Sequence, residues 1–236
     1  MIISSVPSGL GNRIKGILIA LQYTDDIGII WHKNSDCGGQ FRQLFKNDWP
    51  EFKRHPRKAI PFVGHHESGL CSISKEVNWD ISYESTEIEI RQVVENVGKI
   101  QIQDDLLEAA EAVDLPANTL GIAIRTWGGE KERFHKRRRP LEAVFPLIED
   151  YIDWPCYVTS DDPGQIMLIK KQFPTREIIS FQEFDRSPRG TSNRSKTDLI
   201  CMLLLSRCKS LLASPRSSFS ECGWLLGGCR SKIYKI

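Results

Sequence analysis

Residues 120 to 130 read LGIAIRTWGGE, an apolar run that ends in an arginine and, two residues later, a pair of glycines. A short apolar run bounded by glycine is typical of a buried strand, so we expect a strand over residues 120–124. Arg125 then stands at the carboxyl end of that strand. Its planar guanidinium suits a diphosphate group, and the glycines let the backbone come close to a ligand. The alternative is a structural ion pair.

The sequence beyond this strand alternates between strand-like and helix-like patterns. We expect helices over residues 141–151, 163–172, 196–207 and 219–226, and strands over residues 156–159, 177–180 and 210–213. Such alternation favours an α/β fold with a mostly parallel, doubly wound sheet. Because ligands of these sheets bind at the carboxyl ends of the strands, we look for functional residues in the loops that follow them.

The amino-terminal part of the chain shows the same alternation. Residues 2–6 are mostly apolar and precede the turn-rich stretch PSGLG, and apolar residues then recur at helical spacing from Ile14 to Leu21. The apolar residues 27–31 predict the next strand. This strand, helix, strand order implies parallel pairing with a right-handed crossover.

The middle of the chain carries weaker patterns. Several prolines interrupt residues 49–66, so we expect a loop-rich region there. Helix-like periodicity returns over residues 87–97 and 105–113. We place the boundary between two lobes at the break around Pro116. The predicted lobes are residues 1–117, on the acceptor side, and residues 118–236, which bind the nucleotide.

The composition describes an ordinary globular protein. The chain has 236 residues, 40% hydrophobic and 26% charged, with a formal net charge of +2, which is too small to predict a nucleic-acid partner. The first residues lack the pattern of a secretory signal, and no apolar run approaches the roughly 18 residues of a membrane span. The seven cysteines are odd in number and include no Cys-x-x-Cys pair, which favours reduced thiols and a cytoplasmic location.

Two further features carry alternatives. The run from Lys131 to Arg139 is strongly basic and contains Phe134 and His135, a pattern found in nucleic-acid binders; we favour a solvated loop. The pair His65-His66 has no cysteine near it, and neither a His-Glu-x-x-His helix nor an Asp-x-Asp pair occurs. Any chemistry is therefore expected to proceed without a metal ion.

The stretch Gly9-Leu10-Gly11-Asn12-Arg13 lies between the first strand and the first helix. Its glycines permit close approach of a ligand to the backbone, and the helix start offers N–H groups to an anion or a sugar hydroxyl. Asn12 is expected to cap the helix. The alternative is a tight turn that packs the helix on the sheet. The stretch matches neither a P-loop nor the dinucleotide-binding fingerprint.

Two other strand ends carry polar residues. Asp161 and Asp162 follow the strand at 156–159, where a carboxylate can either cap the next helix or accept from a base or ribose. Ser217 and Ser218 stand at the start of the helix at 219–226. Hydroxyl and N–H groups there suit a phosphate, with simple N-capping as the alternative.

The order of these motifs resembles the fucosyltransferase superfamily, which includes nodulation-type, α1,6- and protein O-fucosyltransferases. The matching segments are GLGNRI at 9–14, Trp31 with Cys37, Phe41, Leu44 and Phe45, GIAIRTWGGE at 121–130, VTSDD at 158–162, and KTDLICMLLLSRCKSLLASPRSSFS at 196–220. The resemblance spans most of the chain except residues 46–115.

The resemblance implies a GT-B-like fold, in which two Rossmann-like lobes face a central cleft. It also implies an inverting, metal-independent transferase that moves a sugar, fucose from GDP-fucose, to a glycan acceptor. Arg125 would contact the β-phosphate and stabilise the leaving GDP. The implied donor-binding residues are Gly9, Gly11, Asn12 and Arg13 near the sugar, Asp161 or Asp162 near guanine or ribose, and Ser217, Ser218 and Phe219 around the diphosphate. Arg125, the serine-rich helix start and the glycine stretch are expected to face one shared gap.

The sequence departs from the family pattern at two positions. Ala123 replaces the histidine of the His-x-Arg motif, and Thr126 replaces its second arginine. A catalytically silent nucleotide-sugar or glycan-binding module, or a transferase with a different donor sugar, therefore remains as an alternative. No residue stands out as the base that inversion requires, although Glu130 and Asp36 are candidates.

Overall fold

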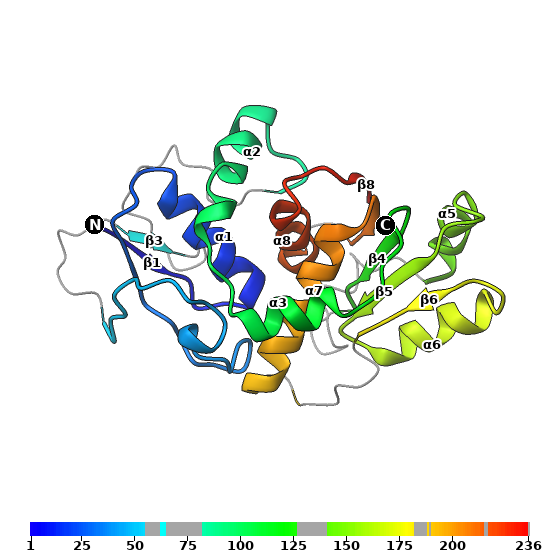
Figure 1. Cartoon of the computed structure of the whole chain (residues 1–236), viewed down its shortest axis with the longest axis horizontal. Coiled ribbons are helices and arrows are strands. Elements are labelled where there is room, and N and C mark those ends of the chain that lie inside the picture. Colours follow the sequence, from blue (N-terminus) through cyan, green and yellow to red (C-terminus); the bar gives the residue numbers. More distant parts are fainter. Residues whose placement is uncertain are drawn as a thin grey trace. The chain divides into compact units, whose positions relative to one another are not determined.

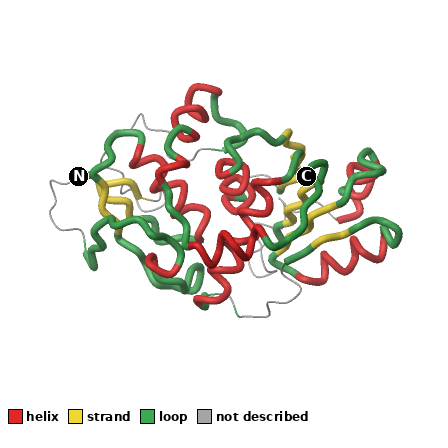
Figure 2. The backbone as a smooth tube through the Cα atoms, viewed as in Figure 1, coloured by secondary structure: helices red, strands yellow, loops and turns green. Residues whose placement is uncertain are grey.

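The structure is a computed structural model that describes residues 1–54, 62–64, 82–126, 141–181, 188, 190–214 and 217–235. The chain forms two compact units (Figures 1 and 2). Unit 1 comprises Met1–Ala109 and Ser187–Ile200, and unit 2 comprises Ala110–Arg186 and Cys201–Ile236. Helix α7 (Ser192–Arg207) is thus divided between the units. The lobes 1–117 and 118–236, defined by their expected ligands, stay a prediction.

Unit 1 contains a three-stranded parallel sheet in the order β2-β1-β3. Strand β1 (Ile2–Ser5) pairs with β2 (Ile27–Ile29) on one side and with β3 (Phe62–Gly64) on the other. The apolar pattern of residues 2–6 and 27–31 is thereby explained, because both strands are buried. The expectation of a loop-rich region over residues 49–66 is wrong at β3. This strand pairs with β1, which is distant in the sequence, so the local pattern does not reveal it.

Helix α1 (Leu10–Leu21) connects β1 to β2 and is buried along almost its whole length. It begins at Leu10 with Gly9 as its N-cap, so the prediction that Asn12 caps the helix is wrong. Asn12 lies inside the first turn, where its Nδ2 donates to Ser8 Oγ at 2.9 Å. The extended backbone of Gly9 (φ −60°, ψ 163°) places the start of the helix earlier than the apolar periodicity does.

The rest of unit 1 consists of short helices and an aromatic cluster. The helices are η1 (Phe41–Gln43), α2 (Glu87–Val94) and η3 (Val97–Lys99), with α3 (Asp104–Glu111) at its boundary with unit 2. Thr86 and Glu89 form a capping box at the start of α2. The rings of Trp31, Phe41 and Phe45 pack within 6 Å of one another between centroids.

Unit 2 is built on a five-stranded, all-parallel sheet in the order β6-β5-β4-β7-β8. Its strands are β4 (Leu120–Ile124), β5 (Cys156–Ser160), β6 (Ile178–Ile179), β7 (Ser210–Ala213) and β8 (Lys232–Lys235). The predicted strands at 120–124 and 210–213 are confirmed to the residue. Strand β8 was not predicted.

The helices of unit 2 follow the predicted alternation. They are η5 (Leu141–Ala143), α5 (Phe145–Glu149), α6 (Pro163–Gln172), the carboxyl part of α7, and α8 (Ser218–Leu226). Apolar side chains from β4, β5, α5 and α6 form one core, which includes Leu120, Ile122, Val158, Ile148 and Ile166. The α/β class predicted from the sequence is confirmed.

Gly121 lets β4 lie close to its neighbour. A Cβ at this position would stand 2.5 Å from Leu211 Cδ2 and 3.0 Å from Cys208 Sγ, closer than side chains tolerate.

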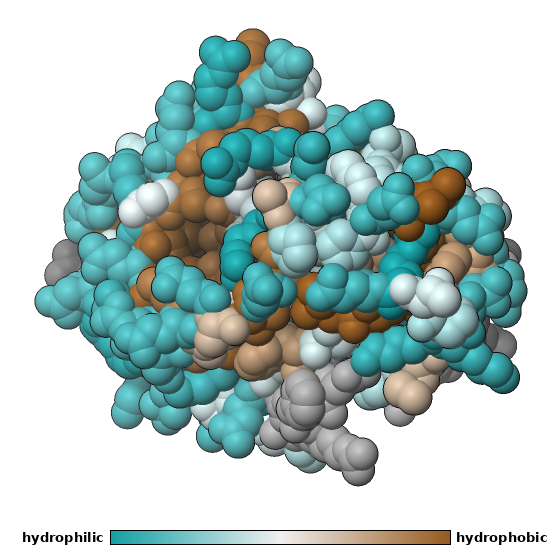
Figure 3. Space-filling view, turned by 45° about the vertical axis from the view of Figure 1, so that its right-hand side comes forward, coloured by the Kyte–Doolittle hydropathy of each residue, from teal (hydrophilic) through white to brown (hydrophobic). Residues whose placement is uncertain are grey.

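The visible surface in Figure 3 is mostly hydrophilic. No helix within the described ranges has both the length and the apolarity that crossing a bilayer requires. The six cysteines in those ranges are free thiols, and Cys71 lies outside them.

Candidate functional site

The sheet of unit 2 reverses its direction of growth between β4 and β7. After β4 the chain adds β5 and β6 on one side, and then crosses to add β7 and β8 on the other. In a doubly wound sheet, the crevice at such a switch point, outside the carboxyl ends of the strands, is where ligands bind. The residues that follow β4 and β7 are therefore the first candidates for a site.

Arg125 occupies this switch point. Its backbone N–H donates to Ser214 Oγ at 3.0 Å, and Ser214 Oγ donates to Ala123 O at 3.3 Å. These bonds tie the carboxyl end of β4 to the residue that follows β7. The guanidinium Nη1 lies 3.0 Å from Asp161 Oδ2, in an ion pair whose side chains are 25% and 14% exposed. The alternative of a structural ion pair is thus present in the structure, and contact with a diphosphate stays a prediction.

Asp161 links the ends of β4 and β5. Besides the contact with Arg125, its Oδ1 accepts from Thr126 N at 2.6 Å and from Thr126 Oγ1 at 2.8 Å. Parallel pairing of Ile124 with Ser160 brings the two strand ends together. Both carboxylate oxygens are engaged, so Asp161 holds Arg125 and Thr126 in place. Its expected contact with guanine or ribose stays a prediction.

Asp162 serves the following helix instead. As the N-cap of α6 it accepts from Gly164 N at 2.9 Å through Oδ1, and its Oδ2 accepts from Gln165 Nε2 at 3.1 Å. The capping alternative is therefore confirmed for this aspartate. A carboxylate at the first turn also interacts favourably with the helix dipole.

The start of α8 has no side-chain cap. N-capping by Ser217 was the alternative to phosphate binding at this position. Ser217 stands at the N-cap position and is buried, yet its side chain makes no capping hydrogen bond. Its carbonyl accepts from Ser220 Oγ at 3.1 Å. Ser218 and Phe219 follow in the first turn and are partly buried. Because helix N-termini carry unpaired N–H groups and positive dipole charge, this start suits an anion.

In unit 1, the glycine stretch surrounds a buried arginine. Arg13 is 2% exposed, its Nε donates to Ser8 O at 2.6 Å, and its Nη2 donates to Asn34 Oδ1 at 3.1 Å. Its Cζ lies 4.8 Å from the centroid of the Trp31 ring. Nη1 is buried and has no hydrogen-bond partner among the described residues. An unsatisfied buried donor is costly, so this nitrogen suits contact with a ligand.

The two glycines of this stretch differ in their surroundings. Gly11 is buried in the first turn of α1. A Cβ on Gly9 would meet no described atom within 4 Å, and the φ of −60° suits any residue. Neither packing against the described residues nor backbone conformation therefore requires a glycine at position 9. Close approach of a ligand to the backbone is a reason that would require one.

A histidine that the sequence did not single out joins the ends of β1 and β2. His32 Nε2 lies 3.0 Å from Ser5 Oγ in a hydrogen bond whose donor depends on the imidazole tautomer. Burial, and secondarily the positive charge of Arg13, lower the pKa of His32 below its ordinary value. The sequence signal that could have identified His32 is its position as a polar residue directly after the predicted strand at 27–31.

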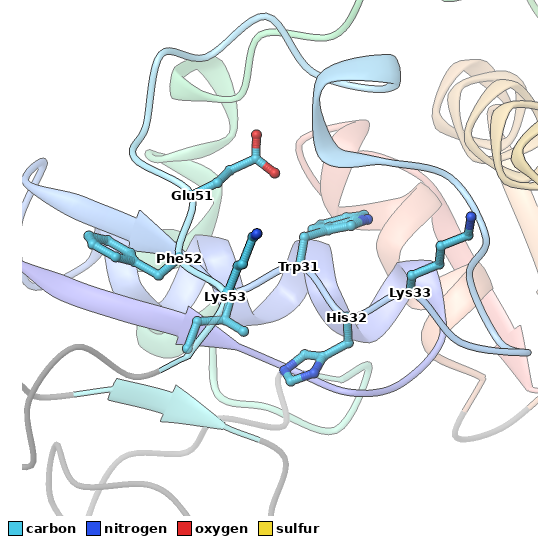
Figure 4. Close-up of a pocket in the computed structure, with 7 residues that line it drawn as sticks. Trp31, His32, Lys33, Glu51, Phe52 and Lys53 are labelled. Atoms are coloured by element: carbon cyan, nitrogen blue, oxygen red, sulfur yellow. The ribbon is translucent and has the colours of Figure 1, made fainter.

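His32 also lines a pocket of about 560 Å³ at the carboxyl end of β2 (Figure 4). Its lining residues are Ile30, Trp31, His32, Lys33, Glu51, Phe52 and Lys53. Trp31 was the one member that the motif comparison named.

Several candidates lie outside the described residues. They are Glu130, the basic run Lys131 to Arg139, the glycine pair at 128–129 and the pair His65-His66. Asp36, the other candidate base, is described: its backbone N donates to Asn34 Oδ1 at 3.0 Å. Within the described ranges no three His, Cys, Asp or Glu side chains gather as a metal site would require.

Solved structures of low sequence identity share this architecture. NodZ α-1,6-fucosyltransferase from Bradyrhizobium, soaked with GDP-fucose, aligns with a TM-score of 0.58 at 14% identity over 95% of this chain and 91% of its own. The chain has a fucosyltransferase-like GT-B fold. POFUT1 in complex with GDP gives 0.58 at 12% identity, over 100% and 99% of the two chains. A mutant of Arabidopsis thaliana FUT1 in complex with GDP gives 0.57 at 14% identity, over 100% and 71%.

The α/β fold class with parallel sheets that the motifs implied is thereby confirmed, and the facing of two lobes across a central cleft stays a prediction. No protein-family model and no curated protein matches the sequence. At identities of 12 to 14%, the likeness describes the fold and leaves donor, acceptor and site residues as proposals.

Proposed function

We propose that this chain is a glycosyltransferase that moves a sugar, fucose from GDP-fucose, to a glycan acceptor. The observation that carries the proposal is the position of Arg125, held by Asp161 and Ser214 at the switch point between β4 and β7. A fixed cation at the carboxyl edge of a parallel sheet suits a nucleoside diphosphate. The fucosyltransferase-like fold supports this donor class.

Each predicted donor-binding residue has a role in this proposal. Arg125 stabilises the negative charge that develops on the departing GDP, and Asp161 keeps its guanidinium oriented. The uncapped start of α8, with Ser217, Ser218 and Phe219, offers N–H groups to the phosphates. Gly9, Gly11, Asn12 and Arg13 contact the sugar. Asp162 acts through α6, which it caps, rather than through the donor.

We further propose inversion at the anomeric carbon without a metal ion, in the cytoplasm. Arg125 and the α8 N-terminus would supply the positive charge that a divalent cation supplies in other transferases. Inversion also needs a proton acceptor for the acceptor hydroxyl, and we assign none.

A catalytically silent module is the second candidate. It is favoured by Ala123, which replaces the family's histidine, and by the ion pair that already engages Arg125. Such a module would bind a nucleotide sugar or a glycan without turning it over. A transferase for a different donor sugar remains a variant of the first proposal.

Hydrolysis of GDP-fucose, with and without glycan acceptors, separates these candidates. We expect slow release of GDP from the unaltered chain and a loss of about a hundredfold or more in Arg125→Ala. Arg230→Ala is a matched control. Arg230 precedes β8 and so lies at the amino ends of the strands, whereas Arg125 lies at their carboxyl ends. GDP binding without turnover of any GDP-sugar would favour the silent module. Equal turnover in Arg125→Ala would refute the role of Arg125.

A further inference from the structure

The pocket of unit 1 arises where two parallel segments separate. Ile29 N donates to Pro50 O and Phe52 N donates to Ile29 O, both at 2.8 Å, so residues 50–52 extend the sheet beside β2. Beyond Ile29 and Phe52, no further backbone hydrogen bond joins these two described segments, and the pocket opens between residues 30–33 and 51–53. It therefore lies outside the carboxyl end of β2, the edge at which parallel sheets bind ligands.

The ring of Trp31 gives the pocket a fixed apolar surface. Trp31 is held in place, because its Nε1 donates to Gly39 O at 2.6 Å and Arg13 stacks on its ring. Trp31 and Phe52 are both partly exposed. Sugars bind such rings through their C–H faces, and a ring that is already fixed loses little entropy on binding.

The polar lining carries an excess of positive charge. Glu51 is already paired, with Arg42 Nε 3.1 Å from its Oε1. Lys33 and Lys53 are exposed and have neither an ion-pair nor a hydrogen-bond partner among the described residues. In Figure 4 both lysines extend to the same side as the Trp31 indole, whereas His32 points to the opposite side.

The pKa of His32 is a second indication of positive charge beside the pocket. Burial and, secondarily, the positive charge of Arg13 lower the pKa of its imidazole, so the field of Arg13 adds to the positive charge beside the pocket. An aromatic surface and two unpaired ammonium groups together match a sugar that bears a negative charge.

We propose that this pocket binds one sugar unit of the acceptor, and that this unit carries an anionic group attracted by Lys33 and Lys53. The inference rests on the proposed function in one respect, namely that the acceptor is a glycan. A carboxylate and a phosphate share the required chemistry. The Trp31 ring would hold the sugar ring, and the lysines would select against neutral units.

The test compares three probes in the absence of donor: methyl β-D-glucuronide, glucose 6-phosphate and methyl β-D-glucoside. Affinities are measured by ligand-observed NMR on the full chain. We expect at least one anionic probe to bind more tightly than the neutral glucoside, and the tighter of the two identifies the anionic group. Lys33→Gln and Lys53→Gln should each weaken that binding about two- to fivefold, with a smaller effect at high salt.

Lys171→Gln is the matched control, because it removes one exposed charge from α6, far along the chain from the pocket. Equal affinity for the three probes would overturn the proposal. So would lysine variants that bind as the unaltered chain does, or a control that weakens binding as much.

A GDP titration of Lys33→Gln/Lys53→Gln separates this proposal from the one it rests on. GDP binding that persists while no anionic preference is found would sink the pocket proposal alone. Anionic sugar binding without any GDP binding would sink the donor assignment alone.

Discussion

At the scale of single residues, the charge of Arg13 has consequences for its surroundings. The guanidinium is 2% exposed and stacks on Trp31, so little water screens its field. The pKa of His32, which is bonded to Ser5 in the same region, is lowered by burial and secondarily by this charge. The arginine was predicted to contact the donor from its position in a motif. Its burial depends on Trp31 and Asn34, which are distant in the sequence, and was therefore not visible in the pattern.

The titration of His32 tests this view. We expect its imidazole to titrate below the ordinary value of about 6.5. In the window between the lowered folded pKa and the unfolded one, the unfolded chain binds more protons. Stability should therefore rise with pH through this window and fall as pH drops through about 6.5.

The measurement is an NMR titration of the histidine rings, with His32 assigned by its absence in His32→Asn. The variant should also show a flatter dependence of melting temperature on pH. A midpoint at or above the ordinary value would contradict the burial of His32 beside the positive charge of Arg13.

A pair of glycine substitutions tests whether position 9 is shaped by a ligand. Gly9→Ala should keep the melting temperature, because its Cβ meets no described atom within 4 Å, yet weaken donor binding. Gly223→Ala is the contrast, since its Cβ would stand 2.9 Å from Leu205 Cβ and 3.1 Å from Met202 O. It should lower the free energy of unfolding by about 1–3 kcal/mol.

Thermal denaturation and GDP-fucose titration of both variants provide the readout. Undiminished GDP-fucose affinity in Gly9→Ala would remove Gly9 from the donor site. A lowered melting temperature would show instead that the glycine is structural.

At the scale of elements, adjacent aspartates serve different parts of the fold. Asp161 joins β4 to β5 through Arg125 and Thr126, whereas Asp162 caps α6. The sequence predicted two carboxylates at the end of a strand, with capping as one alternative. It left open which of them caps, because that depends on the register of Ile124 beside Ser160, which brings Arg125 next to Asp161.

Substitution of the two aspartates should separate stability from binding. Asp162→Ala should cost about 1 kcal/mol through loss of the cap, or roughly 2–4 °C in melting temperature, with GDP affinity unchanged. Asp161→Asn places an amide hydrogen donor where Arg125 needs an acceptor, and we expect it to weaken GDP binding. Denaturation and GDP titration are compared side by side. An equal fall in GDP affinity in both variants would argue against the assignment.

The bounds of some elements were predictable and those of others were not. The apolar runs of β4 and β7 are flanked by turn residues, and Pro163 marks the start of α6, so their bounds agree with the prediction. Strand β8 was not predicted because it is a short edge strand with only two residues, Ile233 and Tyr234, between its lysines. Helix α1 starts early because a glycine, with little preference of its own, acts as its N-cap.

At the scale of the whole molecule, alternation of strands and helices predicted the α/β class and two parallel sheets. Motif order then led to the fucosyltransferase-like fold, which solved structures of 12 to 14% identity share. The membership of residues 187–200 in unit 1 was not predictable, since it depends on contacts such as Gly39 N with Ser195 Oγ at 3.0 Å. Whether Arg125, the α8 start and the glycine stretch face a shared gap stays a prediction.

The central claim is that unit 2 binds a nucleoside diphosphate through Arg125, at the carboxyl ends of β4 and β7. Calorimetric titration of GDP into the unaltered chain, Arg125→Ala and Arg230→Ala tests it most directly. The account predicts saturable binding that falls by about tenfold or more in Arg125→Ala, as expected for loss of a charge-assisted contact, and is kept in Arg230→Ala. Absence of GDP binding to the unaltered chain, or equal affinity in Arg125→Ala, would contradict it.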